Sequence, residues 1–251
     1  MKRYAIAAFF AAFAIGGSAL AADVAPGEAS VDWSGFYVGA SGMLSNADVE
    51  FSDPWDGHIG DRLTAADSDD LSGAGLGAHI GYLHQHGNFV IGAEMFAAWN
   101  NADGCVVVRE TDPSGCPYGH SIETEIEHAL GVDAKFGIAA GPVLFYGLAG
   151  VSWTSVKSTY NDWTFGGEDD FYDPEDDSID TNSEMAFGLR LGGGAEFMVT
   201  EQISVFAQGA YTSLDTSFLA KDLTALEGDE DTGLESEIGL VQANVGVNFH
   251  F

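Results

Sequence analysis

The stretch IGLVQANVGVNFHF, residues 238–251, decides which fold the sequence predicts. From Val241 to Phe251, apolar residues alternate with polar or small ones. A period of two gives an extended strand one apolar and one polar face. The run is long enough for a tilted strand to cross a bilayer, which takes about 9–11 residues. At the end of an exported chain, this pattern favours the closing strand of an outer-membrane barrel over a half-buried strand of a soluble protein.

The start of the chain predicts export. Lys2 and Arg3 precede an apolar stretch rich in Ala and Phe, and Ala19-Leu20-Ala21 follows as a small-x-small box. This arrangement is typical of a secretory signal peptide. We expect cleavage after Ala21, a flexible lead-in over residues 22–32 and a barrel over residues 33–251. No later segment offers the ~18 consecutive apolar residues of a transmembrane helix.

The charge balance excludes one class of partner. The formal net charge of −31 becomes −33 once the two bases of the signal peptide are removed. A nucleic-acid surface needs clustered Lys and Arg, so nucleic acid is not an expected partner. Strong acidity favours the attraction of cations instead, and it carries no information about the fold.

Alternation like that of residues 238–251 recurs along the chain. We expect eight strands, at residues 33–45, 71–84, 89–99, 122–138, 143–155, 183–197, 203–214 and 238–251. The apolar cluster at the start of the first strand, from Trp33 to Tyr37, suits an aromatic girdle at a membrane surface. Residues 143–146 are apolar at every position, so the facing of the fifth strand stays open.

The connections between these strands alternate in length. Three are short turns, and four are long acidic segments at residues 46–70, 100–120, 157–182 and 215–237. Bacterial barrels show this asymmetry, with long loops outside the cell and short turns in the periplasm. The predicted fold class is all-β: an eight-stranded antiparallel up-and-down transmembrane barrel with four long acidic extracellular loops and three short periplasmic turns.

Polar side chains on the second face of these strands would point into the lumen. Eight strands leave an interior that side chains just fill, and charges in such a space must be paired. We therefore predict a lumen network formed by His79, Glu94, Asp133, Lys135, Arg190, Glu196 and Gln208. Acids outnumber bases in this set, so any conductance would favour cations.

Two further features concern the long loops. Cys105 and Cys116 lie close together in an exported chain, which makes a disulfide the default expectation. The acidic runs at residues 168–170 and 173–177 supply oxygen ligands suited to Ca²⁺ or Mg²⁺. The sequence lacks the residue spacing of a calcium-binding loop. We therefore expect these acidic runs to bind divalent cations only weakly, and the bound cations to bridge the loops to lipopolysaccharide.

The segment Trp33-Ser34-Gly35-Phe36-Tyr37-Val38-Gly39, after an Ala-Asp-Val-Ala-Pro lead, resembles the opening of small alphaproteobacterial outer-membrane proteins. These are OmpA/opacity-like barrels of the "porin family", which include an immunogenic surface group. The similarity spans the mature chain and is strongest at residues 33–40, 89–99 and 238–251. The resemblance implies the β-barrel assembly machinery as a folding partner, with Phe249 and Phe251 in its recognised terminal strand. The loops look longer and more acidic than in that family.

The sequence leaves several functions open. A monomeric barrel with a structural and surface role in the outer membrane is favoured, since the lumen should be filled. The alternatives are a narrow porin-like channel for small solutes and, more weakly, a surface receptor or adhesin acting through its loops. Catalysis is not expected, because no Ser–His pairing stands out near the strand histidines His79 and His128. We expect neither a cofactor nor a defined metal site.

Overall fold

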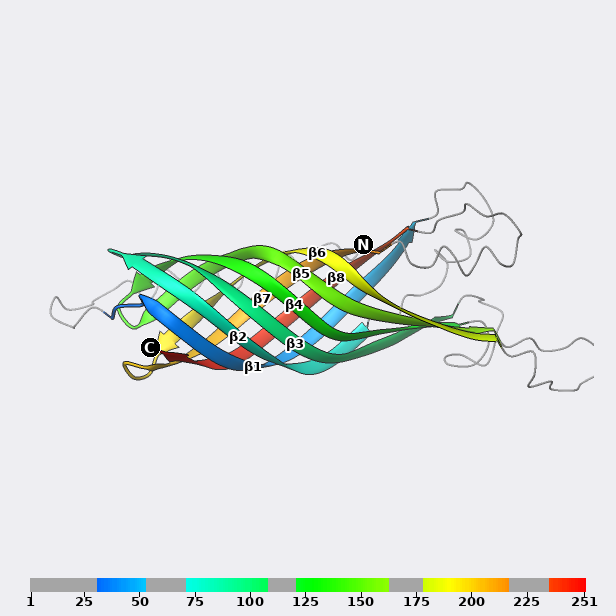
Figure 1. Ribbon diagram of the computed structural model, residues 1–251, viewed down its shortest axis with the longest axis horizontal. Helices are drawn as coiled ribbons and strands as arrows, with labels where there is room; N and C mark the ends of the chain where they lie inside the picture. Colours follow the sequence, from blue (N-terminus) through cyan, green and yellow to red (C-terminus); the bar gives the residue numbers. More distant parts are fainter. Residues whose placement is uncertain (1–30, 53–70, 108–120, 163–177, 217–234) are drawn as a thin grey trace, which may run out of the picture.

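The computed structural model describes residues 31–52, 71–107, 121–162, 178–216 and 235–251. Within these ranges the chain forms strands from one end to the other (Figure 1). The strands are β1 (Gly35–Ser52), β2 (Leu71–His86), β3 (Phe89–Val107), β4 (Ser121–Ala140), β5 (Val143–Asp162), β6 (Ser178–Met198), β7 (Ile203–Thr216) and β8 (Glu235–His250). No helix among the described residues is long and apolar enough to span a membrane.

The eight strands close into one barrel in chain order, each antiparallel to its neighbours. Closure is made by β1 and β8, which pair from Tyr37 opposite His250 to Ser52 opposite Glu235. Full closure removes the exposed edges that an open sheet would present. The predicted all-β, eight-stranded antiparallel barrel is therefore confirmed.

Short turns gather at one end of the barrel, on the left of Figure 1, together with the start of β1 and the end of β8. We call this the turn end and the opposite end the loop end. Gly87 and Gly141 begin two of the turns with φ of 63° and 60°, a left-handed conformation that glycine adopts without steric cost. The connections at the loop end, residues 53–70, 108–120, 163–177 and 217–234, lie outside the described residues.

Strand pairing extends further toward the loop end than the sequence predicted. β1 runs to Ser52, β3 to Val107 and β5 to Asp162, and β6 begins at Ser178. These ends fall inside segments that we had expected to be loops at 46–70, 100–120 and 157–182. Hydrogen bonding between strand backbones does not require apolar side chains. The alternation of apolar and polar residues therefore ends before the strand pairing does. Figure 1 shows β5 and β6 projecting beyond the other strands.

Apolar side chains cover the outside of the barrel. Leu76, Phe89 and Val245 are among the most exposed, at 69%, 68% and 68%. Lumen-facing positions are less exposed and largely polar or glycine; on β2, each second residue from Gly73 to Gly81 is a glycine or His79, between the buried Leu71 and Leu83. A water-soluble barrel would have the opposite arrangement, with polar residues outside and apolar ones within.

Three details of side-chain facing differ from the sequence analysis or complete it. Trp33 is fully buried at the turn end, so it is not part of an outer girdle; Phe36, 61% exposed, lies on the outside. Ile126 faces inward although Leu130 faces outward, because a β-bulge between Ile126 and Ala129 shifts the alternation. On β5, the ambiguous run places Tyr146 inside, with Leu144 and Leu148.

A closed eight-stranded barrel should resist unfolding by detergent until it is heated. We expect the unheated protein to migrate at a different position from the boiled protein in dodecyl sulfate gels, because the intact barrel binds less detergent and stays compact. The measurement is the electrophoretic mobility of the outer-membrane fraction with and without boiling. An identical band in both lanes would contradict a closed barrel.

Candidate functional site

The middle of the lumen is built around a buried ion pair. Lys135 Nζ lies 2.6 Å from Glu94 Oε2, and both side chains are almost fully buried. The Tyr37 hydroxyl donates to the same carboxylate oxygen at 2.7 Å. The ammonium also lies over two aromatic rings, 5.2 Å from the centre of Tyr37 and 4.7 Å from that of Tyr146. Charge pairing, a hydroxyl donor and cation–π contacts together compensate for removing these charges from water.

Glu196 forms a second centre nearer the turn end. Its Oε1 accepts from Asn248 Nδ2 at 2.7 Å and from the hydroxyl of Ser204, and it lies 3.1 Å from His250 Nε2. Because the amide nitrogen of Asn248 points at Glu196, its oxygen faces His79 Nε2, at 2.6 Å. That nitrogen of His79 must therefore carry the proton. The same nitrogen lies 3.9 Å from Glu94, so the two carboxylate centres are connected.

Asp133 and Arg190 form a third, looser pair. Arg190 Nε lies 3.6 Å from Asp133 Oδ2, and its guanidinium stacks on Phe96 at 4.3 Å from the ring centre. Gln208 accepts a hydrogen bond from the Tyr146 hydroxyl at 3.0 Å and lines the same cavity as Glu94 and Arg190.

The residues expected in the lumen network all have their side chains inside the barrel. The sequence analysis missed the aromatic and polar partners that complete it, namely Tyr37, Tyr146, Ser204, Asn248 and His250. Asn248 and His250 lie on the polar face of β8, so the period-two pattern could have found them. Tyr37 and Tyr146 lie in apolar runs, where the sequence gives no sign that their hydroxyls donate to Glu94 and to Gln208.

An apolar layer lies inside the barrel at the turn end. We call it the Trp33 cluster; it consists of Trp33, Tyr37, Leu83, Val90, Ala139, Leu144, Tyr146, Leu148 and Met198. Three hydrogen bonds from backbone N–H groups fix the segment around Trp33. The backbone N–H of Trp33 donates to Gln85 Oε1, and that of Gln85 donates to Ser34 Oγ. The backbone N–H of Ser34 donates to Asp32 Oδ1. The last of these lowers the pKa of Asp32 by stabilising its charged form.

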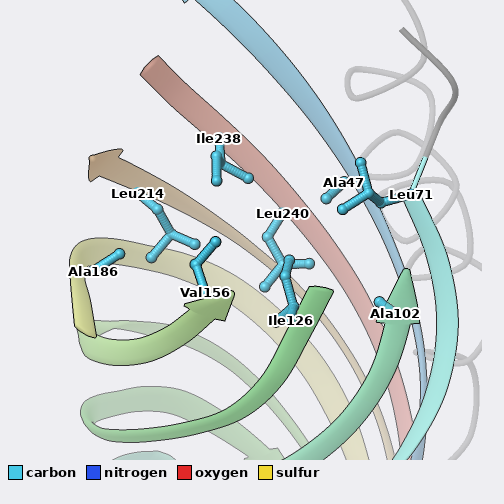
Figure 2. Packing of buried hydrophobic residues seen from close by; sticks show 9 residues of the cluster. All are labelled: Ala47, Leu71, Ala102, Ile126, Val156, Ala186, Leu214, Ile238 and Leu240. Atoms are coloured by element: carbon cyan, nitrogen blue, oxygen red, sulfur yellow. The ribbon is translucent and has the colours of Figure 1, made fainter. Parts of the chain in front are cut away.

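A second apolar layer lies inside the barrel toward the loop end (Figure 2). We call it the apolar collar; every strand contributes, through Ala47, Leu71, Ala102, Ile126, Val156, Ala186, Leu214, Ile238 and Leu240. The register explains the ring, since Leu240 stands opposite Ala47 and Ala47 opposite Leu71, while Ala102 stands opposite Ile126 and Ile126 opposite Val156. Each collar residue is at most 6% exposed. Aliphatic side chains therefore occupy the lumen at this level, as the ion pairs do at its middle.

Ser204, His250 and Glu196 are the residue types of a hydrolase triad, and they lie within hydrogen-bond distance of one another. Their geometry does not fit that role. In a triad, the two ring nitrogens of the histidine serve the nucleophile and the acid separately. Here Ser204 Oγ, at 3.0 Å, and Glu196 Oε1, at 3.1 Å, both contact His250 Nε2. Ser204 is also fully buried and donates directly to Glu196, so it has no free approach to a substrate.

The remaining predicted residues lie at the two ends of the barrel. Phe249 and Phe251 are exposed on the outer face at the turn end, with ring centres 5.1 Å apart. The backbone of Cys105 pairs with Glu123, while Cys116 lies outside the described residues, so the disulfide stays a prediction. No three His, Cys, Asp or Glu side chains of the described ranges are arranged to hold a metal ion.

Comparison with known proteins identifies the family. A model described as "Outer membrane protein beta-barrel domain" matches residues 6–251. The chain belongs to this outer-membrane β-barrel family. Its location is therefore the outer membrane, as the sequence analysis predicted. The 22 kDa outer membrane protein of Rhizobium leguminosarum bv. viciae is 26% identical over 228 residues, which cover 91% of this chain and 83% of the relative.

Two solved structures are similar to this chain at low identity. The outer membrane protein OprG of Pseudomonas aeruginosa is 15% identical, with a TM-score of 0.49, and the match covers 88% of this chain and 97% of OprG. Neisserial surface protein A is 16% identical, with a TM-score of 0.45, over 87% of this chain and 98% of that protein. The family model supports the family and the location predicted from the sequence.

Proposed function

We propose that this protein is a non-conducting structural barrel that presents its loops at the cell surface. In this proposal the outer apolar belt contacts membrane lipid, the turn end faces the periplasm and the loop end faces the medium. Glu94, Glu196 and Asp133 are each paired inside the lumen with buried partners, so they hold the barrel together instead of lining a water-filled path. A pore lining would be hydrated and open along its length.

The single observation that carries the proposal is the filled lumen. The polar centre lies between the Trp33 cluster at one end and the apolar collar at the other. An ion that crossed the barrel would have to lose its water twice, once at each apolar layer, and pass two ion pairs and the hydrogen-bonded Glu196 between them. Eight strands enclose too little space for side chains and a continuous water column together.

Recording from planar bilayers tests this proposal directly. We expect the purified, folded barrel to give no discrete conductance steps in 1 M salt, at potentials where a porin reconstituted in parallel does. Folding is checked first by the heat-dependent gel mobility. Reproducible steps from the folded fraction would contradict the proposal and favour the narrow cation-preferring channel instead. The one observation that favours a channel is a cavity of about 30 Å³ beside Glu94 and Arg190.

The proposed partners follow from the surface. Lipid would contact the belt, and lipopolysaccharide would be bridged weakly through divalent cations held by the acidic loops. Phe249 on β8 and Phe251, directly after this strand, are exposed and suit recognition by the β-barrel assembly machinery. We propose a monomer without a cofactor or an enzymatic activity. A receptor or adhesin role would act through the loops and through the Cys105–Cys116 disulfide, and deletion of residues 104–117 would abolish it.

A further inference from the structure

The two internal apolar layers mark matching heights on opposite sides of the barrel. On β2, Leu83 belongs to the Trp33 cluster and Leu71 to the apolar collar. On β6, four strands away in the closed barrel, Met198 and Ala186 belong to the same two layers. The two layers are separated by the same number of residues on both strands. The outward-facing residues of β2 and β6 can therefore be compared level by level.

At the level of the collar, the outside of the barrel is polar on most strands. The collar residues face inward, so their neighbours in sequence face outward. Among the described side chains, the exposed or half-buried polar neighbours, which we call the polar ring, are Asn46, Ser72, Asn101, Asp103, Glu125, Glu127, Lys157 and Ser213. On β8 the neighbours are Gly239 and Val241, whereas on β6 they are Met185 and Phe187, both exposed. Because the apolar band of a membrane barrel ends where its outward residues become polar, β6 is apolar above the edge of that band.

A group of large apolar side chains forms this exception. On β6 the outward face stays apolar from Met185 through Phe187 and Leu189 into the belt. Phe187 stands opposite Trp153 on β5, and the two rings meet edge to face with their centres 5.7 Å apart. On β7, by contrast, Ser213 already stands opposite Leu189. We call Trp153, Met185, Phe187 and Leu189 the apolar ridge; it lies at the base of the part of β5 and β6 that projects beyond the other strands (Figure 1).

The ridge raises the upper limit of the apolar surface on one side of the barrel. On β2 the last outward apolar residue is Ala74, the third residue below the collar residue Leu71. On β6 it is Met185, just above the collar residue Ala186. For strands tilted by about 40°, this difference places the end of the apolar surface roughly 10 Å higher on β6 than on β2.

The size and the continuity of the ridge select its partner. A stable protein interface buries about 800 Å² on each partner, which four partly exposed side chains do not supply. The ridge has no charged member, and it continues without a polar interruption into the belt. We propose that acyl chains of outer-leaflet lipid cover the ridge up to Met185, so that the hydrocarbon layer is thicker beside β6 than beside β2. A bilayer adapts to a longer apolar surface by local thickening, at a modest energetic cost. This inference rests on the proposed function, in which the belt contacts lipid.

Methyl NMR of the full barrel in nanodiscs of palmitoyl-oleoyl phosphatidylcholine tests the ridge, with methionine as the reporter. Met95 on the belt is 61% exposed and is the positive control, while Met43 and Met198, buried in the lumen, are the negative controls. We expect cross-relaxation between acyl-chain methylene protons and the methyls of both Met185 and Met95. Acyl contact at Met95 with only water, headgroup or a second copy of the chain at Met185 would overturn this inference alone. No acyl contact at Met95 would contradict the lipid-facing belt itself, and the ridge with it.

Bilayer thickness provides a second, independent readout. Met185→Ser gives β6 the polarity that Ser72 gives β2. In vesicles of dioleoyl phosphatidylcholine we expect this change to raise the unfolding equilibrium constant several-fold, because the thicker hydrocarbon covers Met185; in thinner dilauroyl vesicles we expect a smaller rise. Leu76→Ser is the matched control, since Leu76 lies well within the belt on β2 and its loss should cost the same in both lipids. An equal effect of Met185→Ser in the two lipids would contradict the ridge.

Discussion

Replacing Lys135 with Met is expected to lower the free energy of unfolding by about 3–5 kcal/mol, the usual cost of removing one partner from a buried ion pair. The substitution leaves the Glu94 carboxylate charged in the lumen with only the Tyr37 hydroxyl as a close donor. Met has a similar length to the Lys stem, so packing against Tyr37 and Tyr146 changes little. The measurement is an equilibrium urea titration of the barrel folded into phospholipid vesicles.

Two further variants separate charge from packing. In Glu94→Gln/Lys135→Met no charge is stranded, and the Gln side chain can still accept from Tyr37, so we expect most of the lost stability to return. Lys157→Met removes a pair of similar length, 2.9 Å from Glu125, but both side chains are about one-third exposed. An exposed pair contributes roughly 1 kcal/mol or less. Equal losses for Lys135→Met and Lys157→Met would show that burial of the pair does not matter.

The facing of most strands could be predicted because one rule governs it. Any strand with a lipid-side face must place apolar residues at every second position, and the sequence displays this on β2, β6 and β8. Leu76, Leu189 and Val245 are exposed as that rule requires, at 69%, 64% and 68%. The rule also identifies inward positions such as Glu94 and Arg190 without any knowledge of their partners.

The rule fails where the backbone or the alternation is irregular. The bulge in β4 places Glu127 and His128 both outside, so counting in twos from Leu130 puts Ile126 on the wrong face. Trp33 precedes β1 and has no strand position, so its sequence context suggested a membrane girdle. Gln85, 52 residues away on β2, accepts a hydrogen bond from its backbone N–H, a contact that the sequence around Trp33 does not reveal.

The sequence also does not reveal which charged side chains pair in the lumen, because this depends on the register between neighbouring strands. In the β3–β4 register, Glu94 stands directly opposite Asp133, a like charge. The partner of Glu94 is Lys135, which is the next inward-facing residue of β4 after Asp133. Lys135 stands opposite Gly92, and its side chain reaches diagonally to Glu94 on the neighbouring strand. The charged members of the network could be predicted from the sequence, whereas the strand register of the closed barrel determines which of them form pairs.

Trp33→Ala is the second substitution from which we expect a large effect. It empties the centre of the Trp33 cluster, and deletion of a buried aromatic side chain typically costs about 3–5 kcal/mol. Urea titration in vesicles measures the loss. Trp153→Ala is the matched control, since Trp153 is 42% exposed on the outer face and its removal leaves no internal cavity. Similar losses for both variants would contradict the assignment of Trp33 to the packed interior.

Trp33→Phe and a conductance measurement then separate packing from closure. The indole Nε1–H of Trp33 is buried without a hydrogen-bond partner among the described residues, so Phe removes an unpaired donor while keeping an aromatic ring. We expect Trp33→Phe to cost much less than Trp33→Ala. Because the apolar collar closes the other end independently, the folded Trp33→Ala barrel should still show no conductance steps. Steps in this variant alone would mean that the Trp33 cluster is the lumen's main barrier and that the collar does not exclude ions.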